Sequence, residues 1–159
     1  MKKSDNNVVS LFEQTNQGVQ KAVLTDSMKM KRGGSLSNPI VAYETWGKLS
    51  KQKDNVVVIL TGLSASSHVA SHSNNSKPGW WEGIVGPDKA IDTNKFYVIC
   101  VNSLGSCFGS TGPASINQIT GEPFRLTFPE LTIDDMATAT KLLLDKLDIK
   151  QINTLVGPH

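Results

Sequence analysis

Two histidines lie close enough in the sequence to act together. His68 and His72, in the segment SASSHVASHSNNS, are separated by three residues, a spacing that places two metal ligands on one face of a helix. The segment is poor in the carboxylates and cysteines that would complete a metal shell. The sequence therefore favours solvated or hydrogen-bonding histidines over a metal site.

A glycine-rich segment could form a phosphate-binding loop. Residues 104–113 read LGSCFGSTGP and follow an apolar run. A phosphate loop needs a helix that begins directly on it, and the P-loop form also needs Gly-Lys followed by Ser or Thr. Here Pro113 and more loop follow and no lysine is present. We therefore expect a tight loop that is structural or lines a pocket.

Cys107 lies in this glycine-rich segment and could act as a reactive thiol. No base is evident near it in the sequence, and an unpaired cysteine more often packs as a small apolar side chain. Trp80 and Trp81 follow a Pro-Gly pair and could stack on a ligand. We favour a large apolar anchor that closes the loop.

A turn after another apolar run is a further candidate. Residues 61–64 read TGLS and follow the β-branched run NVVVIL. In nucleophile-elbow enzymes, a turn at this place supplies one backbone N–H of the oxyanion hole. Any α/β sheet also needs a flexible turn there, so the motif alone assigns no function.

Composition excludes several classes of protein. The 159 residues fit one domain, and 16 basic against 14 acidic residues leave a net charge of +2. A nucleic-acid-binding protein would carry a basic stripe, and a membrane span needs about 18 consecutive apolar residues, which the sequence lacks. The polar residues after Met1-Lys-Lys do not resemble a secretion signal. We therefore expect a cytoplasmic protein with reduced cysteines.

The elements that would position these residues follow an α/β order. Residues 22–30 and 39–46 partly alternate apolar and polar side chains around a Gly-Gly turn, which predicts an antiparallel hairpin. Continuous apolar runs at 55–60, 95–101 and 153–156 predict parallel strands that are buried on both faces.

A helix is predicted between the last two of these strands. Residues 132–135 read TIDD, similar to a capping box, and apolar residues then recur at helical spacing. Two long connectors, 61–93 and 102–131, follow the ends of buried strands, and a short helix around 80–85 is the one helix predicted in them. Because open α/β sheets bind ligands beyond the carboxyl ends of their strands, we expect the functional site there.

Three long motifs follow one another along the sequence: GWWEGIVGPDKAIDT, FYVICVNSLGSCFGSTGPAS and TGEPFRLTFPELTIDD. They resemble the homoserine O-acetyltransferase family of α/β-hydrolase-fold acyltransferases, over roughly residues 23–158. Within that family, GLSA at 62–65, NSLGSC at 102–107 and PFRL at 123–126 are closer to the serine O-succinyltransferases.

The resemblance implies an α/β-hydrolase fold truncated after the fifth strand, with an N-terminal antiparallel hairpin, three parallel strands and a crossover helix. It divides the chain into a polar leader, residues 1–20, and a partial α/β-hydrolase domain, residues 21–159. The family transfers an acyl group from acyl-CoA, through an elbow serine, to the hydroxyl of serine or homoserine. The resemblance implies no bound cofactor, no nucleic-acid or membrane partner, and a homodimer for the full-length protein.

Few of the family's site residues have a counterpart in this chain. Leu63 matches the oxyanion-hole residue through its backbone N–H, and Gly62, Leu63, Ser64 and Ala65 match the turn that sets substrate specificity. His159 stands at the position of the nucleophilic serine, and the Asp and His of the triad would follow later. The resemblance therefore presents this chain as the N-terminal half of an acyltransferase, without catalytic residues and inactive by itself.

Two alternatives remain open. One is an esterase of the same fold, against which the GWW and GSTGP segments argue. The other is a non-catalytic fragment or interaction module that pairs an open strand edge with a partner chain.

Overall fold

A mixed β-sheet forms the centre of the structure, a computed structural model that describes residues 18–62 and 64–157. Its strands lie in the order β1-β4-β8-β5-β9. β1 and β8 run antiparallel to β4, whereas β8 and β9 both run parallel to β5. This arrangement confirms the predicted fold class. The five strands are β1 (Gln20–Val23), β4 (Ile40–Trp46), β5 (Val56–Leu60), β8 (Tyr97–Val101) and β9 (Thr154–Val156).

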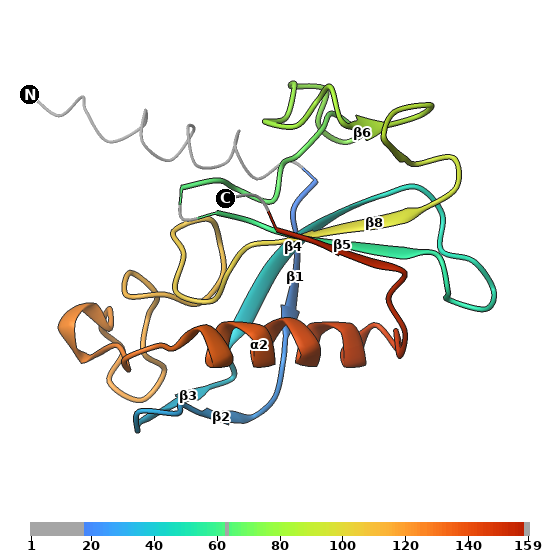
Figure 1. Cartoon of the computed structure of the whole chain (residues 1–159). Helices are drawn as coiled ribbons and strands as arrows, with labels where there is room; N and C mark the ends of the chain where they lie inside the picture. Colours follow the sequence, from blue (N-terminus) through green and yellow to red (C-terminus); the bar gives the residue numbers. More distant parts are fainter. Residues whose placement is uncertain (1–17, 63, 158–159) are drawn as a thin grey trace, which may run out of the picture.

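Smaller elements flank this sheet. β2 (Ser27–Lys29) and β3 (Ser35–Ser37) form an antiparallel pair, and β6 (Val85–Gly86) pairs in parallel with β7 (Ile91–Asp92). A 3-10 helix, η1 (Arg125–Thr127), precedes the helix α2 (Ile133–Lys146). Figure 1 shows α2 on one side of the central sheet and the segment around β6 on the other. Within the described residues we find no helix with the length and apolar character of a membrane span.

The predicted N-terminal hairpin is only partly present. β1 pairs with β4 as expected, but the predicted strand 22–30 is not continuous, because its second half, β2, pairs with β3 instead. Asn38 has a φ of 47° and precedes Pro39, so the chain turns sharply between β3 and β4. The predicted leader, residues 1–20, overlaps the described residues at 18–20, and β1 begins at its last residue, Gln20. Residues 1–17 lie outside the described residues.

The predicted short helix around residues 80–85 is wrong. These residues form turns that lead directly into β6. The backbone completes a single turn, in which the N–H of Val85 bonds to the carbonyl of Trp81. Val85 is then fully buried and pairs with Ile91 of β7, so strand pairing takes over from the helix.

β5 and β8 are buried on both faces, as their continuous apolar runs predict. The same prediction for residues 153–156 is wrong: Thr154 and Leu155 of β9 are exposed, because β9 lies at the edge of the described sheet with β5 as its neighbour. Alternate residues of a strand face opposite sides of its sheet. On one side, Val58 and Ile99 belong to the same apolar cluster as Leu143 of α2. On the other side, Ile59 and Cys100 cluster with Val69, which lies in the connector between β5 and β6. One face of the sheet is thus covered by a helix and the other by a connector whose described residues form turns and bends before β6.

α2 begins at the predicted capping box. The Thr132 hydroxyl accepts the backbone N–H of Asp135 at 3.2 Å, and the Asp135 carboxylate accepts the backbone N–H of Thr132 at 2.8 Å. Asp135 also accepts the backbone N–H of Lys31 at 3.0 Å, which ties the helix to the β2–β3 pair. Burial acts to raise the pKa of Asp135, but these hydrogen bonds outweigh it and hold the pKa below its ordinary value.

The variant Thr132→Ala should lower the free energy of unfolding by about 1 kcal/mol, because the amide of Asp135 loses its cap. Urea denaturation followed by circular dichroism measures this change. Thr138→Ala is the control, since Thr138 lies on the exposed face of α2 and bonds the carbonyl of Asp134 from within the helix. An equal loss of stability in both variants would contradict the role of the cap.

Candidate functional site

The connectors that follow β5 and β8 meet at one edge of the central sheet. Because the two strands are parallel, their carboxyl ends lie at the same edge. A pocket of about 690 Å³ is lined by both connectors. Ser66 and His68 contribute from the first connector, and Asn102 and Cys107 from the second. The pocket lies where the sequence analysis expected the functional site.

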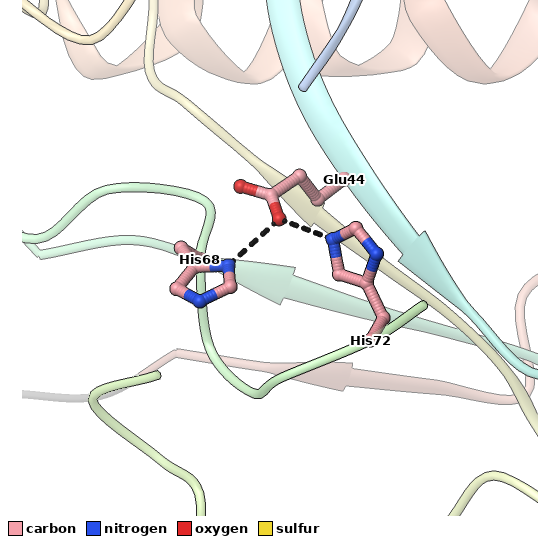
Figure 2. Close-up of side chains that lie close together, drawn as sticks. All are labelled: Glu44, His68 and His72. Atoms are coloured by element: carbon pink, nitrogen blue, oxygen red, sulfur yellow. Dashed lines mark hydrogen bonds and ion pairs between the residues drawn. The ribbon is translucent and has the colours of Figure 1, made fainter. Parts of the chain in front are cut away.

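A buried carboxylate at this pocket organises the first connector. Glu44 of β4 is completely buried. Its Oε2 lies 2.9 Å from His68 Nδ1 and 2.9 Å from His72 Nε2, while the Ser67 hydroxyl donates to Oε1 at 3.0 Å. Figure 2 shows the two imidazoles converging on Glu44 from the connector after β5. All three partners come from this connector, so Glu44 fixes it to the sheet.

Glu44 is a site residue that was not predicted from the sequence. The signal that could have found it is its place in the strand IVAYETW. Ala42 and Trp46 lie two positions away on either side, share its face of the strand and are buried. An acidic residue between two buried apolar positions needs partners, because an unpaired buried charge is strongly destabilising.

The three side chains carry the donor types of a zinc site, and their ligand atoms lie within 4.8 Å of one another. The hydrogen bonds of His72 do not fit such a site. His72 Nδ1 accepts the backbone N–H of Asn74 at 3.2 Å, so the proton of a neutral His72 ring is on Nε2 and points at Glu44. A metal would need that Nε2 lone pair. The arrangement is therefore that of a hydrogen-bonded carboxylate.

Asn102 links the two connectors. It follows β8 directly and is buried. Its Oδ1 accepts the backbone N–H of Ser67 at 2.6 Å, and its Nδ2 donates to Ser67 Oγ at 3.1 Å and to the carbonyl of Phe108 at 2.8 Å. Ser67 is thus held by β4 through Glu44 and by the second connector through Asn102.

A second carboxylate closes the first connector. Glu82 accepts the backbone N–H of Ser71 at 2.7 Å, the hydroxyl of Ser71 at 2.9 Å and the backbone N–H of Gly79 at 3.0 Å. A Cβ at Gly79 would lie 2.1 Å from the carbonyl carbon of Val69, so no other residue fits this close approach. The connector therefore folds back on itself between Val69 and Gly79.

The tryptophans act as anchors of this fold. Trp80 Nε1 donates to the carbonyl of Ser66 at 2.8 Å, and the backbone N–H of Trp81 donates to the carbonyl of Val69 at 2.8 Å. The two ring centroids lie 5.0 Å apart. Trp81 packs against the apolar cluster of β5 and β8, as the predicted apolar anchor requires. Trp80 is 36% exposed and is attached through its hydrogen bond to Ser66.

The glycine-rich segment both builds the fold and lines the pocket. Ser110 Oγ donates to the carbonyl of Asn102 at 2.7 Å and accepts the backbone N–H of Ala42 at 2.9 Å, which binds the segment to β4. Gly105 has a φ of 89°, and its N–H donates to the carbonyl of Thr111 at 2.8 Å. Gly109 lies in the pocket wall. The tight loop expected from the sequence is confirmed.

The two cysteines have opposite environments. Cys107 is exposed at the pocket, so the expectation that it packs as a small apolar side chain is wrong. Cys100 in β8 is the buried one. Burial, and then the charge of nearby Glu44, raise the pKa of the Cys100 thiol well above its usual range.

The turn assigned by the resemblance lies next to the pocket. Gly62, Ser64 and Ala65 directly follow β5 and precede the pocket-lining Ser66 and Ser67. The hydroxyl of Thr61 donates to the carbonyl of Val101 at 3.3 Å, which holds the start of the turn against β8. The roles of these residues stay predictions, and Leu63 and His159 lie outside the described residues.

The strand order of the central sheet can be compared with known folds. The family model for the alpha/beta hydrolase fold matches residues 55–157, which include β5, β8, α2 and β9. This chain belongs to that family. The crystal structure of esterase E22 aligns with 88% of this chain and 40% of its own, with a TM-score of 0.79 and 39% identity. Homoserine O-acetyltransferase from Bacillus anthracis aligns with 89% of this chain and 40% of its own, with a TM-score of 0.79 and 33% identity.

Two curated relatives are more similar in sequence than these two structures. Serine O-succinyltransferase from Xanthomonas campestris pv. campestris (strain B100) is 52% identical over 140 residues, which cover 88% of this chain and 37% of the relative. The enzyme of the same name from Frateuria aurantia is 56% identical over 135 residues, 84% of this chain and 37% of the relative. The resemblance read from the sequence is thereby confirmed, and the chain spans little more than a third of these relatives.

Glu82 should make the stability of the chain depend on pH in acid. The backbone N–H groups of Gly79 and Ser71, the Ser71 hydroxyl and the charge of Lys89 together lower its pKa from 4.5 to about 2 against the effect of desolvation. A carboxyl whose pKa is lower in the folded chain stabilises the fold above the pKa of the unfolded chain. This stabilisation is therefore lost as pH falls from 4.5 toward about 2.

Urea denaturation at a series of pH values across that window measures the effect. In Glu82→Gln, the fall in the free energy of unfolding with decreasing pH should be smaller than in the unmodified chain. Glu122→Gln, which removes an exposed carboxyl from the second connector, is the control for the loss of one acidic group. Equal pH dependence in the unmodified chain and Glu82→Gln would show that the hydrogen bonds of Glu82 do not stabilise its charge.

Proposed function

We propose that this chain is part of an O-acyltransferase that moves an acyl group from acyl-CoA to the side-chain hydroxyl of serine or homoserine. The observation that carries the proposal is the identity of 52% and 56% with two serine O-succinyltransferases. Succinyl-CoA and serine are therefore the donor and acceptor that we propose first. A cytoplasmic location and a homodimer of the full-length protein belong to the same proposal.

The strand order supports a place for this chemistry. β5 lies between β8 and β9 in the sheet, so the turn after β5 and the chain after β9 leave the sheet side by side. In this fold the elbow nucleophile follows the strand that corresponds to β9. We assign the oxyanion-binding N–H to Leu63 and the substrate-specificity role to Gly62, Leu63, Ser64 and Ala65. The pocket beside this turn would then hold part of the substrates.

The proposed reaction has two steps. The hydroxyl oxygen of the elbow serine attacks the thioester carbonyl, its proton passes through the triad histidine, and CoA leaves as the thiol. The acceptor hydroxyl then attacks the resulting serine ester, the histidine moves its proton to the elbow serine, and the new O-acyl ester is released. The amide at Leu63 would stabilise the oxyanion that forms in each step. Because His159 stands where the family has the nucleophile, we expect the 159-residue chain alone to be inactive.

Ester hydrolysis is the second candidate function. Esterase E22 has the same TM-score of 0.79 as the Bacillus anthracis homoserine O-acetyltransferase and a higher identity, 39% against 33%. Both reactions pass through an acyl-serine, and they differ in whether water or an amino-acid hydroxyl accepts the acyl group. The acceptor requirement therefore separates the two.

A chimaeric enzyme tests the proposal. Residues 18–157 of this chain would replace the matching segment of the Frateuria aurantia serine O-succinyltransferase, which supplies its own elbow and triad. We expect CoA release from succinyl-CoA that depends on added serine or homoserine, together with the O-acyl amino acid as product. A thiol assay for CoA and mass spectrometry of the product provide the two measurements.

Two controls sharpen this experiment. Replacement of the relative's elbow serine by alanine should abolish product formation, and the 159-residue chain by itself should form none. CoA release at the same rate without an acceptor, or turnover of simple esters in place of acyl transfer, would favour the esterase. Acyl transfer by the unmodified 159-residue chain would contradict its proposed inactivity.

A further inference from the structure

The hydrogen bonds of His68 require more protons than a neutral imidazole carries. Its Nε2 lies 2.8 Å from the carbonyl oxygen of Lys77, which can only accept. Its Nδ1 lies 2.9 Å from Oε2 of Glu44. A neutral ring has one N–H, so a second proton must lie between Nδ1 and the carboxylate.

The other partners of Glu44 decide where this second proton lies. His72 donates from Nε2 to the same Oε2, and the Ser67 hydroxyl donates to Oε1. Hydrogen bonds donated to a carboxylate favour its ionised form. The proton therefore belongs to His68, and a pair of a partly buried imidazolium and a buried carboxylate connects β4 to the connector after β5.

This pair reaches the turn after β5 through one residue. Ser67 donates its hydroxyl to Glu44 and its backbone N–H to Asn102 Oδ1, at 3.0 and 2.6 Å. The other end of the turn is held by the bond from Thr61 to Val101. The residues on either side of the turn are therefore attached to their surroundings: Thr61 bonds Val101 before it, and after it Ser67 bonds Glu44 and Asn102. The carbonyl of Ser66 also accepts a bond from Trp80, so Glu44 supplies one of three attachments at this end.

We propose that Glu44 is a positioning residue of the active site: as an ionised carboxylate paired with protonated His68, it holds Ser67 and thereby the oxyanion-hole turn after β5. The positioning of that turn for catalysis rests on the proposed function. The protonation of His68 and the attachment of Ser67 do not, because they concern this chain alone. The two parts can therefore fail separately.

Nuclear magnetic resonance of the 159-residue chain with isotope-labelled histidine tests the protonation. At neutral pH we expect two ring N–H signals from His68 and one, on Nε2, from His72. Variants that replace each histidine by glutamine assign the signals. A single ring N–H on His68 would overturn the proposal, because Asn75 Nδ2, 3.4 Å from Nδ1, would then be the donor to that nitrogen.

Glu44→Gln removes the charge and keeps the shape of the side chain. His68 should lose its Nδ1 proton and keep the Nε2 proton that it donates to Lys77, because the partly buried imidazolium loses the carboxylate that compensates its charge. The backbone amide of Ser67 should exchange with solvent faster. In the matched control, Glu82→Gln, His68 should keep both ring protons, since Glu82 bonds Ser71 and Gly79 instead.

Cys100 reports whether Glu44→Gln still folds. This thiol is buried while Cys107 is exposed, so a folded variant reacts with a thiol reagent at Cys107 first. Two ring protons on His68 in a folded Glu44→Gln chain would overturn the proposal. If Glu44→Gln does not fold, two other measurements decide the proposal. The two ring N–H signals of His68 in the unmodified chain test its protonation. The Ser67→Ala variant tests the attachment through hydrogen exchange of the backbone amides of His68 and of residues 64–66, and unchanged exchange there would refute the attachment.

Kinetics of the chimaeric enzyme test the catalytic part. Glu44→Gln should lower kcat by about a hundredfold, the cost of a displacement of roughly 1 Å in a catalytic group, with little change in the KM for serine. Glu122→Gln, on the exposed second connector, is the control. A change confined to KM would refute the positioning role. An inactive parent chimaera would count against the proposed function and leave the spectroscopic test intact.

Discussion

An ionised carboxylate inside a β-sheet is stable only when hydrogen-bond donors replace the water that it has lost. Glu44 obtains its donors from one connector, through His68, His72 and Ser67. In turn, the described residues of that connector before β6 form no helix or strand, and the carboxylate bonds three of their side chains to β4. The face of the sheet opposite α2 is therefore organised around a polar contact as much as around its apolar cluster.

Three kinds of contact consequently hold the connector in place. The carboxylates of Glu44 and Glu82 bind its polar groups, the close approach at Gly79 lets it fold back, and Val69 joins the apolar cluster of the sheet. Asn102 then joins it to the second connector. A pocket wall made of loops can have one defined shape because its backbone polar groups are satisfied by buried side chains.

The elements with strong local signals could be predicted from the sequence. Continuous apolar runs predicted the positions of β5, β8 and β9, and the TIDD segment predicted the start of α2, because strand formation and helix capping each depend on neighbouring residues. The burial of β9 on both faces was predicted wrongly, because it depends on what packs against the edge of the sheet. The division of residues 22–30 between two sheets was missed because it depends on the turn at Asn38. The helix expected around Trp80 failed because pairing between β6 and β7 overrides the local pattern.

The location of the site was predicted correctly from the sequence, but not all of its residues were. Strand direction located it at the carboxyl ends of β5 and β8, and His68 and His72 were recognised as a pair. Their partner Glu44 lies 24 and 28 positions earlier, in a strand that read as half-buried, so no local pattern connected them. The environments of Cys100 and Cys107 likewise depend on which residues the sheet covers.

The strand order has a consequence for how the molecule folds. Neighbours in the sheet are distant in sequence: Tyr43 pairs with Val101, Val58 with Ile99 and Val58 with Leu155. Closing such long loops costs entropy before the contacts form, which makes folding slow. The partners of Glu44 can converge only after β4, β5 and β8 have aligned. The polar site thus depends on the alignment of these three strands rather than on any local segment.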